Sequence, residues 1–164
     1  MFAAIFGIIT IITMKRLQLL PLLILLAFPL WSQERPLNTG LSLDEQYALV
    51  GMTLTELLDR FGPPRMVVAS RGYETWQDDV VFQYTGVDFY IFRDRVWQVR
   101  FVSMHGISIG DTRAVVLLTL GDAAEDRGSY ALMPVIGRGW PLRLRVNFNS
   151  AGRVHAIFLY RPDF

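Results

Sequence analysis

Apolar positions follow two different spacings along the chain. Residues 54–61 and 113–120 place apolar side chains three and four positions apart, which is the spacing of one face of a helix. Each stretch follows a Gly-x-Thr triplet and precedes a glycine, so each predicts a short helix with a threonine cap and a glycine stop. Other segments alternate apolar and polar residues, as half-buried strands do. The predicted strands are residues 73–77, 80–85, 87–92, 96–102, 130–136, 140–148 and 154–160.

The two predicted helices begin two similar halves of the chain. The Gly-x-Thr triplets start at Gly51 and Gly110, and the later strand RVWQVRF (95–101) matches RVHAIFL (153–159) with one residue fewer between them. Matches in the same order predict a tandem repeat within one domain. The predicted boundaries are 49–103 for repeat 1 and 104–164 for repeat 2.

One helix with three or four strands buries too little apolar surface to be stable alone. Two such units side by side extend one sheet and share one core. The sequence therefore predicts an α+β fold, in which two tandem helix-plus-antiparallel-sheet repeats form a two-layer domain with the helices on one face of the sheet.

The beginning of the chain is read as a targeting segment and not as part of the fold. From Met14, a Lys-Arg pair precedes an apolar run that ends near the small residue Ser32, which is typical of a secretory signal peptide. We expect residues 1–32 to be this signal, with the true start at Met14, and residues 33–48 to be a polar linker or loosely tied arm. The alternative is an uncleaved N-terminal segment that anchors the chain in a membrane.

Charge and cysteine content narrow the possible roles. Without residues 1–32 the chain keeps 14 arginines and no lysine against 15 acidic residues, so it lacks the strongly basic surface of a nucleic-acid-binding protein. The chain has no cysteine, which excludes disulfides and anchoring through an acylated cysteine. Stability must then come from the apolar core.

Strand alternation predicts which residues lie on the face of the sheet that the helices leave open. Trp97 and its counterpart His155 are expected to point to the helices, whereas their neighbours point away. Arginine and aromatic side chains, which are common in protein interfaces, are expected on the open face. The candidate binding residues are Tyr90, Gln98, Arg100, Arg143, Arg145, Phe158 and Tyr160.

The helix motifs resemble those of a known family. The first motif consists of Gly51, Met52, Thr53, Leu57, Leu58, Phe61, Gly62 and Pro63, and its echo consists of Gly110, Thr112, Val116, Leu117, Leu120 and Gly121. They are similar to the SmpA/OmlA (BamE-like) envelope domain, in a tandem arrangement like that of the β-lactamase inhibitor protein (BLIP-like). The resemblance implies protein–protein contact in the cell envelope or outside it. The acylated cysteine of the assembly lipoproteins is missing here, and Asp122 stands where a proline would be expected.

Sequence motifs for catalysis or metal binding are weak. The two histidines, His105 and His155, have no metal-ligand spacing, and no Gly-x-Ser-x-Gly elbow occurs. We expect no metal and no cofactor. An enzyme would instead need a cleft that joins titratable residues such as His105, Asp111 and Glu125.

These observations favour an exported, non-catalytic binding or adaptor domain, periplasmic or secreted, that has a protein partner. The resemblance implies that this partner is an envelope protein. Contact with a membrane is expected only through an uncleaved N-terminal segment. Two alternatives stay open: a small exported hydrolase with an unrecognised site, and a protein that holds an apolar ligand in a pocket between the layers.

Overall fold

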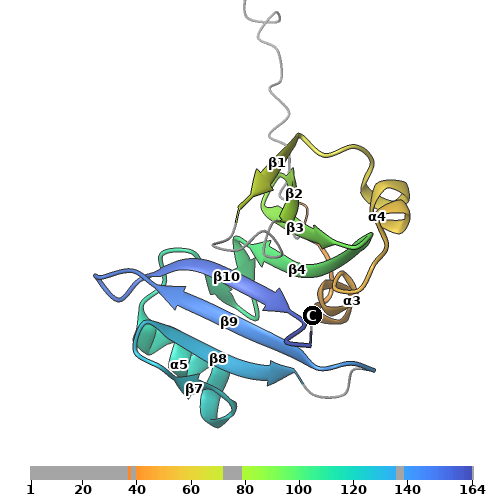
Figure 1. Ribbon diagram of the computed structural model, residues 1–164. Coiled ribbons are helices and arrows are strands. Elements are labelled where there is room, and N and C mark those ends of the chain that lie inside the picture. Colours follow the sequence, from red (N-terminus) through yellow and green to blue (C-terminus); the bar gives the residue numbers. More distant parts are fainter. Residues whose placement is uncertain (1–36, 38–39, 72–78, 136–138, 164) are drawn as a thin grey trace, which may run out of the picture. The chain divides into compact units, whose positions relative to one another are not determined.

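One antiparallel sheet of eight strands dominates the fold (Figure 1). The computed structural model describes residues 37, 40–71, 79–135 and 139–163, all within the compact unit Glu34–Phe164. The strands are β1 (Met66–Ser70), β2 (Asp79–Tyr84), β3 (Val87–Phe92), β4 (Arg95–Phe101), β7 (Glu125–Asp126), β8 (Tyr130–Val135), β9 (Leu142–Phe148) and β10 (Val154–Tyr160), in the spatial order β1-β2-β3-β4-β10-β9-β8-β7. The short strands β5 (Ser103–Met104) and β6 (Ile107–Ser108) form a separate hairpin.

The described residues form three short α-helices, α3 (Leu43–Ala48), α4 (Leu54–Phe61) and α5 (Arg113–Leu120), and α5 runs into the 3-10 turn Gly121–Ala123. The helices predicted at 54–61 and 113–120 are confirmed as α4 and α5. Thr53 and Glu56 form a reciprocal capping box at α4, whereas Thr112 caps α5 alone, since Val115 stands at the position of the glutamate. No helix in this part of the chain is long and apolar enough to cross a membrane.

The predicted fold class is wrong. Two helix-plus-sheet repeats with a helical layer on one face were expected, but the fold is dominated by a single sheet, and its helices have only six to eight residues each. The sheet is continuous because β4 pairs directly with β10, from Gln98↔Tyr160 to Phe101↔Ile157. Helices this short contribute only one or two buried side chains each and do not form a layer of their own.

The two Gly-x-Thr segments make the same local contacts. The N–H groups of Gly51 and Gly110 donate to the carbonyls of Val96 and Val154, each over a short distance of 2.7–2.8 Å. Arg95 donates in turn to the Gly51 carbonyl, as Arg153 does to the Gly110 carbonyl, both at 2.9 Å. Through these hydrogen bonds, the Gly-x-Thr motif holds the segment before each helix against a strand of the sheet.

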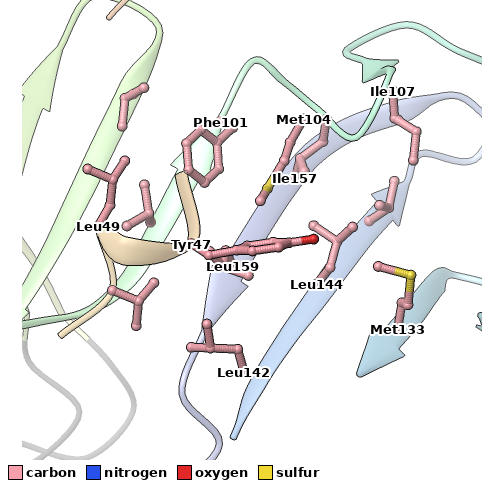
Figure 2. Close-up of a cluster of buried hydrophobic side chains, with 14 of the residues drawn as sticks. Tyr47, Leu49, Phe101, Met104, Ile107, Met133, Leu142, Leu144, Ile157 and Leu159 are labelled. Atoms are coloured by element: carbon pink, nitrogen blue, oxygen red, sulfur yellow. The ribbon is translucent and has the colours of Figure 1, made fainter. Parts of the chain in front are cut away.

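Part of the predicted linker is a helix, and one of its side chains, Tyr47, belongs to the core. The predicted linker 33–48 contains α3, which has a complete capping box formed by Ser42 and Glu45. Tyr47, at the end of α3, is 8% exposed, and the following Leu49 is fully buried. Figure 2 shows the Tyr47 ring reaching across β10 and β9 into the cluster that contains Leu144 and Leu159. The predicted signal peptide (1–32) and the predicted strand at 73–77 lie outside the described residues.

Candidate binding surface on the sheet

The pairing of four neighbouring strands arranges the candidate residues in two rows. One row runs across β3, β4, β10 and β9, and the next row lies two residues further along each strand. Successive residues of a strand point to opposite faces, so both rows face the same side of the sheet. We name these eight residues the two-row face: Asp88, Arg100, Phe158 and Arg145 in the first row, and Tyr90, Gln98, Tyr160 and Arg143 in the second.

All seven candidate residues belong to the two-row face, and Asp88 is the eighth member. The side chains between the rows are Phe89, Val99, Leu159 and Leu144, which point the other way and are fully buried. On the two-row face itself, Arg100 and Arg143 are exposed and the other six residues are half-buried. The face is thus accessible, whereas the opposite side of the same strands is covered by the core.

The first row joins a half-buried carboxylate to an exposed arginine. Arg100 lies opposite Asp88 on the neighbouring strand, with Nη1 3.4 Å from Oδ2. Burial raises the pKa of the Asp88 carboxyl, and the positive charge of Arg100 lowers it in part. The pair is long and partly solvated, so it contributes little to stability and leaves the Arg100 guanidinium able to contact another group.

Aromatic rings occupy the middle of the two-row face. Tyr90 and Phe158 meet edge to face, with ring centroids 6.3 Å apart and planes inclined at 70°. Burial raises the pKa of the Tyr90 hydroxyl, and the Asp88 carboxylate raises it further, so this hydroxyl stays protonated. A half-buried aromatic pair in this position offers apolar surface together with a hydrogen-bond donor.

The two arginines of β9 are held in different ways. Arg145 is fixed by a 2.8 Å hydrogen bond from Nε to the side-chain oxygen Oδ1 of Asn147 and by stacking at 4.2 Å over the ring of Tyr130. Arg143 is exposed and has no hydrogen-bond or ion-pair partner among the described residues. Tyr130 was missed by the sequence analysis because its contact with Arg145 depends on the β8–β9 register.

A shallow cavity of about 300 Å³ lies on this surface. It is lined by Trp97, Gln98, Arg145, Asn147, Phe158 and Tyr160. Five of these residues are polar or carry a polar tip, and their rings supply the apolar part of the wall. The cavity thus combines apolar surface with hydrogen-bonding groups at the centre of the sheet.

The expected orientations of Trp97 and His155 are wrong, because both residues lie in β-bulges. Tyr90 pairs with Gln98 and Ile91 with Val96, which leaves Trp97 as the additional residue in β4. Trp97 therefore lines the cavity beside Gln98, and its indole N–H donates to the Asp79 carboxylate at 2.8 Å. His155 is likewise the unpaired residue at the register shift of β10, and it is exposed.

The titratable residues considered for catalysis each have a separate local partner. His105 forms a hydrogen bond with the Tyr47 hydroxyl, and burial lowers its pKa. Asp111 accepts a hydrogen bond from the backbone N–H of Ser108 at 2.7 Å, and Glu125 forms an ion pair with Arg127. Within the described ranges, no group of three or more His, Cys, Asp or Glu residues could hold a metal ion.

Comparison with known proteins yields one distant structural similarity. No protein-family model matches the chain, and no curated protein matches it. The crystal structure of an extracellular protein containing an SCP domain, from Bacillus anthracis strain Ames, is similar with a TM-score of 0.45 and 13% sequence identity. The match covers 71% of this chain but only 45% of that protein. The resemblance to the BamE-like and BLIP-like domains stays a prediction.

Proposed function

We propose that the protein is an exported, non-catalytic binding domain that holds a protein partner against the two-row face. The observation that carries the proposal is the arrangement of Arg100, Arg143 and Arg145 around the central ring of Phe158 on one accessible face. Arginine and aromatic side chains are the residue types that contribute most to protein interfaces.

The contacts of these side chains support a preformed surface. Arg145 is already oriented by Asn147 and Tyr130, and Phe158 by Tyr90, so binding would restrict few additional side-chain rotations. Arg143 is free to pair with an acceptor from the partner. A periplasmic or secreted location, with removal of residues 1–32, is part of the same proposal.

Replacing both Arg143 and Tyr160 with alanine is expected to weaken capture of the partner while changing the free energy of unfolding by less than about 1 kcal/mol. Arg143 is exposed, and Tyr160 is half-buried on the face that points away from the core, so their removal leaves the core intact. The measurement is the amount of partner that co-purifies with tagged protein after crosslinking in intact cells, together with a chemical denaturation curve.

The control variant is Arg93→Ala, which removes an exposed arginine at the turn between β3 and β4, away from the two rows. It should keep normal capture. Equal capture by the Arg143/Tyr160 variant and the control would show that the two-row face is not the binding surface.

A further inference from the structure

A second hollow lies where the link between α3 and α4 meets the start of β4 and the chain before β9. It has a volume of about 640 Å³ and is open to solvent along most of its length, so a ligand would lie along it and not be enclosed. It is lined by Ala48, Val50, Gly51, Met52, Glu56, Asp59, Arg60, Arg95 and Trp140. None of these residues belongs to the two-row face. We name this hollow the Trp140 groove.

Trp140 is both fixed and accessible. Its ring packs so closely on Gly51 that a Cβ added there would lie 2.7 Å from Cζ2, and the Arg161 guanidinium lies 5.2 Å from the ring centroid. Nevertheless, 41% of the Trp140 surface is exposed. An indole held in this way offers a preformed apolar platform.

The Gly-x-Thr motif does not require this contact. Gly51 and Gly110 have nearly equal φ angles, +98° and +96°, and the same backbone partners described above. Yet among the described residues, apart from the neighbours in the chain, nothing lies within 4 Å of the position of a Cβ at Gly110. Trp140 therefore contacts only one of two otherwise similar segments. Holding the segment against the sheet does not require this tryptophan.

The wall of the groove on α4 carries charged side chains. Glu56, Asp59 and Arg60 line it, and Arg95 comes from β4. The corresponding positions of α5 hold Val115, Leu118 and Thr119, so the charged wall also belongs to one helix alone. Asp59 has no hydrogen-bond or ion-pair partner among the described residues.

These charges restrict the chemistry of a ligand. Two carboxylates and two guanidiniums give the wall no net charge, so it favours neither an anion nor a cation. Glu56 is already engaged by Thr53, and Arg60 pairs with Glu45 at 3.3 Å, so Asp59 and Arg95 are the charged groups with the most capacity left for a ligand. Carboxylates only accept hydrogen bonds and guanidiniums only donate them, whereas a hydroxyl does both. A neutral molecule with many hydroxyls can therefore pair with both kinds of group.

We infer that the Trp140 groove binds a neutral oligosaccharide. One sugar ring packs its apolar C–H face on the Trp140 indole, and its hydroxyl groups donate to Asp59 and accept from Arg95. Because this site shares no residue with the two-row face, it does not depend on the proposed protein partner.

The test is a titration of the full chain with three neutral tetrasaccharides: cellotetraose, maltotetraose and chitotetraose. Tryptophan fluorescence and calorimetry report binding. At least one sugar is expected to bind at concentrations below about 10 mM, and Trp140→Ala is expected to weaken that binding by about tenfold or more. Asp59→Asn, a surface change that leaves the platform in place, should weaken it to a smaller extent.

The Arg143/Tyr160 double variant is the control and should bind sugar normally, so failure of one proposal is distinguishable from failure of the other. Circular dichroism checks that Trp140→Ala folds, and Trp140→Phe, which keeps an aromatic platform, should retain part of the affinity. The inference is overturned if none of the three sugars binds, if Trp140→Ala binds them normally, or if the groove takes up a charged peptide and no sugar.

Discussion

Replacing Phe89 with alanine is expected to lower the free energy of unfolding by about 3–5 kcal/mol. Phe89 is fully buried in β3, where its ring stacks on Phe61 at 5.8 Å and meets Tyr84 edge to face at 5.5 Å. The substitution removes these contacts and leaves a cavity that strands on both sides prevent from collapsing. This loss is a large share of the free energy of unfolding of a typical domain, which is about 5–15 kcal/mol.

Urea denaturation followed by circular dichroism measures this loss. Met66→Ala is the matched control, because Met66 lies on the edge strand β1 and is 55% exposed. This substitution should lower the free energy of unfolding by less than about 1 kcal/mol. If Phe89→Ala and Met66→Ala lowered the free energy of unfolding by similar amounts, the core would not lie on the Phe89 side of the sheet.

Tyr47→Ala is expected to lower the free energy of unfolding by a similar amount, about 3–5 kcal/mol. The Tyr47 ring is 8% exposed and lies against Leu144 and Leu159, as Figure 2 shows, and its hydroxyl bonds to Nε2 of His105. Truncation would leave a cavity over β9 and β10 and release α3 from the sheet. A linker or loosely tied arm would show almost no effect, so this variant separates the two descriptions of residues 43–48.

Tyr47→Phe is the matched variant that keeps the ring and removes only the hydroxyl. It should lower the free energy of unfolding by about 1–2 kcal/mol, because the half-buried His105 loses its hydrogen bond to the Tyr47 hydroxyl. Thermal and urea unfolding of both variants provide the measurement. A cost for Tyr47→Ala no larger than that for Tyr47→Phe would contradict the packing of the ring.

The pH dependence of stability provides a further readout on Tyr47. Burial lowers the pKa of His105 in the folded state below its ordinary value of about 6.5, so the unfolded chain binds a proton more readily. The stability due to neutral His105 is complete above the unfolded pKa and is lost as the pH falls through the folded pKa. Tyr47→Ala exposes His105 and should reduce this loss.

Local signals predicted part of the fold and most of the candidate surface. The helices α4 and α5 follow from a capping threonine, apolar spacing and a terminating glycine, all within about a dozen residues. The two-row face follows from the strict alternation of side chains along β3 and β9. Those patterns depend only on residues close together in the chain, so they can be recognised in a single sequence.

The remaining features depend on pairing between distant strands. The continuous sheet requires the β4–β10 pairing, which no local pattern specifies. The bulges at Trp97 and His155 insert one residue into an otherwise regular alternation, so the orientation expected from alternation is wrong there. Residues 43–48 are mostly polar, and the single buried ring of Tyr47 is too weak a signal to predict α3.

The central claim is that a protein partner lies on the two-row face, and site-specific photo-crosslinking in the producing cells tests it most directly. A photoreactive phenylalanine analogue replaces Phe158 in one variant and Leu118 in another. Leu118 is 85% exposed on α5 and does not belong to the face. We predict that the probe at position 158 captures a defined protein and the probe at position 118 does not. Equal adducts at both positions, or an adduct at position 118 alone, would contradict the account.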